Sequence, residues 1–166
     1  MEILIVEDVD EKYTDIERVF KETVGFICDP RRASNLNDAE DEVMLGKWNL
    51  IILDISMDIS SSGSAALNAG HATMGGLDIL ERMFLLKISA PTVLVTGFDS
   101  FQDADRFDNA IMNLHDISSI AANWLGAAYL GSVRYGTTNW DMNFQQIIRN
   151  WEKNESSCNS RQGKSI

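Results

Sequence analysis

Stretches of consecutive apolar residues alternate with amphipathic stretches along the whole chain. Short apolar runs between polar or turn residues are typical of buried strands, whereas apolar residues three or four positions apart are typical of one face of a helix. The apolar runs predict strands at 3–6, 26–28, 50–53, 92–96 and 128–135. The periodic stretches predict helices over 10–24, 76–87, 118–125 and 140–151. They also predict a helix that is capped by Asn35 or Asn37 and extends through Met44.

This alternation of strand and helix predicts an α/β fold, with a parallel sheet that is covered by helices on both faces. The run at 50–53 is apolar without alternation, as expected for a central strand covered on both faces, and T-V-L-V-T at 92–96 predicts another buried strand. In such folds, ligands bind beyond the carboxyl ends of the strands, near the point where the strand order reverses. Residues at that edge of the sheet are therefore the first candidates for a functional site.

Length and composition indicate one globular domain. The 166 residues are enough to bury a core, and the apolar fraction of 45% and charged fraction of 23% are ordinary for a globular protein. We expect a single domain over 1–154. The segment 155–166 is polar and rich in serine, which predicts a flexible carboxyl-terminal tail.

The net charge of the chain indicates which kinds of partner it binds, and its cysteines indicate its cellular compartment. A formal net charge of −11 disfavours binding to DNA or to an anionic membrane, and favours a metal cation or a basic protein surface. Cys28 and Cys158 lie far apart and fit no metal spacing, which indicates a reduced, cytoplasmic protein. No signal-peptide pattern is evident, and no apolar run approaches the roughly 20 residues that span a bilayer.

Acidic residues follow two of the predicted strands. Glu7 and Asp8 come directly after the first strand, Asp54 follows the strand at 50–53, and Thr96 ends the strand at 92–96. In a parallel sheet these positions share one edge, where carboxylates would raise one another's pKa unless a cation neutralised them. Oxygen ligands in a partly hydrated site suit Mg²⁺. We expect Asp8 and Asp54 to bind Mg²⁺ directly, with Glu7 reaching it through water.

Four segments make the chain resemble the receiver domains of two-component response regulators, the CheY-like family. They are I-L-I-V-E-D at 3–8, L-I-I-L-D at 50–54, G-G-L-D-I-L at 75–80 and V-L-V-T-G at 93–97. They cover the order and most of the length of that family's fold. The resemblance implies a flavodoxin-like, doubly wound sheet of five parallel strands in the order 2-1-3-4-5.

The resemblance also implies roles for individual residues. Asp54 would be the phosphoacceptor, taking a phosphoryl group from a histidine kinase or phosphotransfer protein. Mg²⁺ would be held by Glu7, Asp8, Asp54 and the backbone carbonyl of Ser56, while Thr96 would hydrogen-bond the phosphoryl group. Signalling would proceed by contact with an unidentified downstream protein. Enzymatic activity would be limited to Mg²⁺-dependent self-phosphorylation and self-dephosphorylation at Asp54.

One position departs from the family's pattern. Receiver domains carry a lysine at the end of the fifth strand, but this chain has no lysine between Lys87 and Lys153. Matching V-R-Y to the family's V-K-P places Arg134 there, whereas matching Y-L-G-S to Y-L-x-K places Ser132 there. We favour Arg134 because it keeps a cation nearer the carboxyl end of the strand, although arginine does not replace lysine neutrally.

Two long connections, 55–74 and 97–116, leave the same edge and could cover the site or form a partner surface. Together with the missing lysine, they favour an alternative function, that of a pseudo-receiver that acts as an interaction module without phosphorylation. A third candidate is a phosphatase of the haloacid-dehalogenase kind. It ranks last, because that family has a second acid two residues after its nucleophile and Ser56 stands there.

Overall fold

The computed structural model describes residues 1–57, 74–102 and 110–162, with side chains as far as 157. Five parallel strands form its main sheet, in the order β2-β1-β3-β4-β7. This order confirms the predicted flavodoxin-like topology of a doubly wound sheet. The strands are β1 (Ile3–Val6), β2 (Arg31–Ala33), β3 (Leu50–Leu53), β4 (Thr92–Thr96) and β7 (Tyr129–Arg134).

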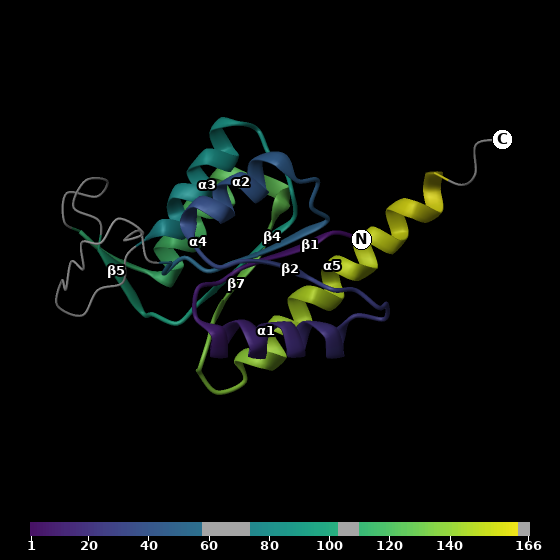
Figure 1. Cartoon of the computed structure of the whole chain (residues 1–166), viewed down its shortest axis with the longest axis horizontal. Helices are drawn as coiled ribbons and strands as arrows, with labels where there is room; N and C mark the ends of the chain where they lie inside the picture. Colours follow the sequence, from purple (N-terminus) through teal and green to yellow (C-terminus); the bar gives the residue numbers. More distant parts are fainter. Residues whose placement is uncertain (58–73, 103–109, 163–166) are drawn as a thin grey trace.

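Helices cover both faces of the sheet (Figure 1). On one face lie α1 (Asp10–Thr23) and α5 (Trp140–Gln162), whose Phe20 and Trp151 rings have centroids 6.4 Å apart. On the other face lie α2 (Leu36–Leu45), α3 (Gly75–Leu85) and α4 (Leu114–Leu125). The sheet therefore separates two apolar cores.

Alternation along each central strand divides its side chains between these cores. Ile3 and Ile5 of β1 pack with α1 and α5, whereas Leu4 and Val6 pack with α2, α3 and α4. All the residues of β1, β3 and β4 are buried. A strand that is buried on both faces favours apolar residues at successive positions, which explains the uninterrupted apolar runs of β1, of β3 and of residues 93–95 in β4.

Side-chain caps account for where two of the helices begin. The side chain of Asn35 accepts a hydrogen bond from Asp38 N at 2.9 Å, so Asn35 rather than Asn37 caps α2. Asn113 and Asp116 form a reciprocal capping box, which starts α4 at Leu114, earlier than the predicted 118.

One sequence prediction about strands was wrong, and one pair of strands was not predicted. The second strand is Arg31–Ala33 and not 26–28, because Phe26 and Cys28 pack from the connection against the core beneath α1 and α5. The segment 97–116 contains an unpredicted antiparallel pair, β5 (Ser100–Gln102) and β6 (Ile111–Asn113). Strands of three residues are too short for their periodicity to be read from sequence.

Beyond the sheet, α5 continues to Gln162, well into the segment 155–166 that was predicted to be a tail. Of the two long connections, 55–74 and 97–116, residues 58–73 and 103–109 lie outside the described part, so their expected role as a cover or a partner surface stays a prediction. None of the helices among the described residues is long and apolar enough to cross a membrane.

Candidate functional site

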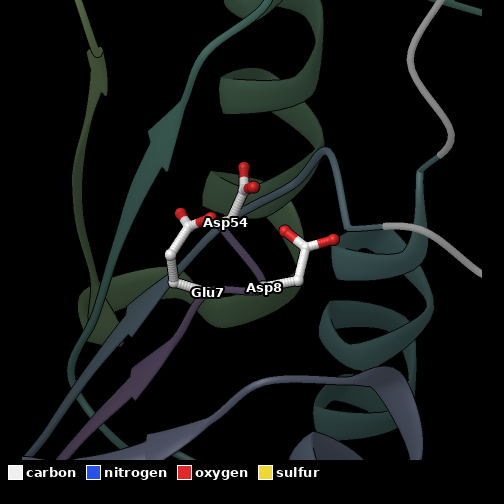
Figure 2. A group of neighbouring side chains, drawn as sticks. All are labelled: Glu7, Asp8 and Asp54. Carbon is white, nitrogen blue, oxygen red and sulfur yellow. The ribbon is translucent and has the colours of Figure 1, made fainter. Parts of the chain in front are cut away.

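Three carboxyl groups meet at the carboxyl-terminal edge of the sheet, where β1 and β3 end. Glu7, Asp8 and Asp54 each offer an oxygen atom, and these atoms all lie within 4.8 Å of one another. Figure 2 shows the carboxyl groups of Glu7 and Asp8 on either side of Asp54. The expectation that the parallel sheet brings these three acids together is met, because Val6 and Leu53 are paired in register just before them.

Backbone hydrogen bonds continue the sheet by one residue into this edge. Glu7 N donates to Ala33 O at 3.0 Å, and Asp54 N donates to Val6 O at 3.0 Å. The guanidinium of Arg32 donates to the carbonyl oxygens of Glu7 and Asp8, at 3.0 and 3.1 Å. These bonds hold the turn after β1, and with it the two acidic side chains.

A buried lysine from α1 neutralises part of this charge. Lys12 Nζ lies 2.7 Å from Glu7 Oε2 and 2.9 Å from Asp54 Oδ2, and the Lys12 side chain is only 6% exposed. Lys12 stands one turn before Ile16 on the face of α1 that packs on the sheet. Sequence analysis missed Lys12, although a lysine on the apolar stripe that follows the acid pair was a usable signal.

The Glu7 side chain is unusually placed for an acid. It is fully buried, and burial together with the Asp54 carboxylate raises its pKa to about 7, against the lowering effect of Lys12. Glu7 Oε1 accepts a hydrogen bond from Val9 N at 2.9 Å, whereas Oε2 has only the ion pair with Lys12 and no hydrogen bond of good geometry. Glu7 is therefore an acid whose charged state needs additional positive charge nearby.

Ser56 holds the Asp54 carboxylate from the other side. Its backbone N–H donates to Asp54 Oδ1 at 2.9 Å, and its hydroxyl lies 2.7 and 2.9 Å from the two carboxylate oxygens. Ser56 was predicted to act through its carbonyl oxygen, and that role stays a prediction. Its side chain and N–H are nevertheless placed to orient Asp54.

Thr96 ends β4, the strand beside β3, and is fully buried. Its hydroxyl oxygen accepts a hydrogen bond from Phe98 N at 3.3 Å. The structure thus places Thr96 on the expected edge of the sheet. Its contact with a phosphoryl group stays a prediction.

The two residues that were candidates for the family's lysine position, both in β7, have partners other than Asp54. Arg134 donates to both carboxylate oxygens of Asp99, at 2.6 and 3.2 Å, and to Tyr135 O at 2.8 Å. The Ser132 hydroxyl lies 2.6 Å from that of Ser118 on α4. The structure therefore brings Lys12, rather than Arg134, to the Asp54 carboxylate, and a role for Arg134 at Asp54 stays a prediction.

The donor set of this site fits a hard divalent cation. Three carboxylates and one ammonium leave two negative charges uncompensated when every group is ionised, and Glu7 Oε2 is a buried acceptor without a hydrogen bond. Oxygen ligands of this kind are those that Mg²⁺ prefers. The residues present therefore fit the expected metal.

No family model and no curated protein matches the chain. Solved structures do. A CheY-like response regulator receiver domain protein from Methanospirillum hungatei JF-1 has a TM-score of 0.53 and 19% identity, over 92% of this chain and 97% of that one. A receiver domain protein from Clostridium thermocellum has a TM-score of 0.57 and 14% identity, over 95% of this chain and 98% of that one.

The signal receiver domain of a LuxO-like repressor protein from Vibrio parahaemolyticus has a TM-score of 0.58 and 13% identity, over 94% of this chain and 95% of that one. These likenesses extend over nearly the full length of both partners in each comparison. Together with the strand order, they show that the chain has the fold of CheY-like response regulator receiver domains.

Proposed function

We propose that this protein is a phosphoacceptor receiver domain of two-component signal transduction. Asp54 accepts a phosphoryl group, in the presence of Mg²⁺, from a histidine kinase or phosphotransfer protein in the cytoplasm. The observation that carries the proposal is the position of the Asp54 carboxylate at the end of β3, within 4.8 Å of oxygen atoms of Glu7 and Asp8. Signalling then proceeds through contact with a downstream protein.

The reaction requires an oxygen nucleophile and compensation of charge. An oxygen atom of Asp54 attacks the phosphorus of a phosphohistidine, the P–N bond breaks, and the histidine nitrogen keeps the electron pair and takes up a proton. The product on this chain is an acyl phosphate. Because phosphoryl transfer asks little further covalent chemistry of the protein, catalysis rests mainly on positioning the reactants and on stabilising the charge of the phosphoryl oxygens.

Each residue near Asp54 has a part in that scheme. Asp8 and Asp54 would hold Mg²⁺ directly, with the carbonyl of Ser56, and Glu7 would act through a water ligand. Bound Mg²⁺ supplies positive charge to the phosphoryl oxygens. The Ser56 N–H and hydroxyl orient the Asp54 carboxylate, and the Thr96 hydroxyl, at the end of the neighbouring strand, binds a phosphoryl oxygen.

A second candidate is a pseudo-receiver, which keeps the fold and acts as an interaction module without phosphorylation. One observation favours it. The Lys12 ammonium already compensates Glu7 and Asp54 at 2.7 and 2.9 Å, so the pocket holds a counter-charge of its own. The three converging carboxylates argue against it, because with Lys12 as their counter-charge they still carry two uncompensated negative charges, which a divalent cation would neutralise.

Intact-protein mass spectrometry after incubation with acetyl phosphate separates these two functions. We expect one added phosphoryl group in the presence of Mg²⁺, its loss with a chelator, and its loss in Asp54→Ala. The matched control is Asp29→Asn, which changes an aspartate whose side chain is 95% exposed and which pairs only with Lys21 in the ion pairs of the described residues. A folded wild-type protein that gains no mass would favour the pseudo-receiver.

A further inference from the structure

We infer that Lys12, from the first turns of α1, is the cation that pairs with the phosphoryl group on Asp54. This inference rests on the proposed function and goes beyond it, because it assigns to a helix a role that the resemblance places at the end of the fifth strand. The Lys12 ammonium is 2.9 Å from Asp54 Oδ2 and only 6% of its side chain is exposed.

The position of Lys12 is difficult to explain by stability alone. It lies on the apolar face of α1, where the next buried positions are Ile16, Val19 and Phe20. A buried ion pair is no more stabilising, in general, than well-packed apolar side chains of the same volume. A lysine at this position is instead matched to the two carboxylates it contacts, Glu7 and Asp54.

Besides its two carboxylates, Lys12 lies near an aromatic ring at the end of the sheet. Its Nζ lies 6.0 Å from the centroid of the Tyr135 ring, which follows β7 directly. Tyr135 is fixed in turn, because its hydroxyl donates to Asp15 Oδ2 on α1 at 2.8 Å and its N–H donates to Thr96 O at 2.8 Å. The ammonium is thus held among the ends of β1, β3 and β7.

Arg134, at the end of β7, is hydrogen-bonded to a different acid, Asp99. Arg134 is paired in register with Thr96, but its guanidinium makes two hydrogen bonds to Asp99, in the connection after β4. Moving Arg134 to Asp54 would break both bonds. Lys12 needs no such rearrangement, because it already contacts the acceptor carboxylate.

The chemistry follows from this contact. Before transfer, the ammonium balances the charge of the Asp54 carboxylate. After transfer, the carboxylate has become a neutral acyl group, and its charge has been replaced by the charge of the phosphoryl oxygens. A cation within hydrogen-bond distance of the acceptor stabilises that charge as it develops, and one such donor typically contributes on the order of 100-fold to rate.

The test compares the rate of phosphorylation by acetyl phosphate in Lys12→Gln with that of wild type, and the affinity for Mn²⁺ by calorimetry in the same proteins. We expect Lys12→Gln to lose on the order of 100-fold in rate. We expect its Mn²⁺ affinity to be equal or tighter, because a positive charge has been removed from beside Glu7 and Asp54. The matched control is Lys21→Gln, an exposed lysine on the same helix, which should retain both properties.

Two further variants make the result decisive. Lys12→Met, which continues the apolar stripe of α1, serves if Lys12→Gln does not fold, as judged by circular dichroism. Lys12→Arg keeps a cation and should recover part of the lost rate. Phosphorylation of Lys12→Gln and Lys12→Met at the wild-type rate would overturn the inference, as would a loss confined to Arg134→Gln. A wild-type protein that takes no phosphoryl group would overturn the proposed function itself, which is a different outcome.

Discussion

Gly76, in the first turn of α3, packs directly against the main-chain carbonyl of Asp54. A Cβ at position 76 would overlap that carbonyl oxygen and would also lie 2.6 Å from the Cα of Ile55. Both neighbours are backbone atoms, and Gly76 N donates to Ile55 O at 3.2 Å. The glycine therefore lets α3 approach the end of β3 and helps to set where the Asp54 carboxylate stands.

Replacing Gly76 by alanine should destabilise the protein. In a helix alanine is favoured over glycine by about 1 kcal/mol, but overpacking against rigid backbone costs about 1–3 kcal/mol. We expect the second effect to win, because the added Cβ would meet rigid backbone atoms, with a net loss of up to about 2 kcal/mol in the free energy of unfolding, measured by urea denaturation. Gly97→Ala is the control, because a Cβ there meets nothing within 4 Å. Equal stability of Gly76→Ala and wild type would contradict this account.

The raised pKa of Glu7 predicts a dependence of stability on pH. Its pKa is about 7 in the folded protein and near 4.5 in the unfolded chain, so between these values the folded state holds a proton that the unfolded state has lost. Stability should therefore fall as pH rises from about 4.5 to 7, by up to about 3 kcal/mol in metal-free buffer. Urea denaturation at several pH values with a chelator present measures this slope.

Glu7→Gln should remove most of that slope, because the amide does not titrate. Glu22→Gln changes an exposed acid on α1 and serves as the control. Adding Mg²⁺ to the wild type should also flatten the slope, since a nearby cation favours the charged carboxylate. An unchanged slope in Glu7→Gln would place the pH dependence in another group.

Substitutions of Asp8 and of Ser56 should reduce the affinity for Mg²⁺ to different extents. Asp8→Asn removes a charged ligand and should weaken Mg²⁺ binding about tenfold or more, whereas Ser56→Ala keeps its backbone carbonyl and the N–H that orients Asp54, and should weaken binding less than Asp8→Asn does. Isothermal titration calorimetry with Mg²⁺ measures both, and Asp141→Asn, on the surface of α5, is the control. Equal losses in both variants would mean that the Ser56 hydroxyl, rather than its carbonyl, supports the metal.

The Tyr135 hydroxyl should ionise only at unusually high pH. Burial, the hydrogen bond to Asp15 and the neighbouring acids raise its pKa to about 12. The folded protein then keeps this proton between about pH 10 and 12 while the unfolded chain loses it, so Tyr135 contributes to the loss of stability as pH rises through that range. Ultraviolet absorbance titration should show a late tyrosinate step that is absent in Tyr135→Phe. A late step that persists in this variant would assign it to another tyrosine.

Several features of the fold and the site could be predicted from the sequence. The segments at 3–6, 50–53 and 92–96 are buried strands in the structure, because a strand covered on both faces favours successive apolar residues, as at 3–6, 50–53 and 93–95. Once the strands are parallel, the residues that follow them share an edge. That rule is sufficient to bring Glu7, Asp8 and Asp54 together, and it depends only on local pattern and chain order.

Local sequence pattern was insufficient to predict a strand that is defined by the other strand it pairs with. Arg31–Ala33 is a strand because it pairs with β1, although the segment 26–28 is more apolar. The pair β5 and β6 is likewise defined by pairing over only three residues on each side.

The identity of the cation at Asp54 was decided by tertiary structure alone. From the sequence, Arg134 was the nearest cation to the end of the last strand, yet its side chain reaches Asp99. Lys12 lies four positions after Asp8, in a helix, and packing of α1 on the sheet turns its side chain inward to Glu7 and Asp54. A long side chain can reach several acids, and only the packing of the elements around it determines which one it pairs with.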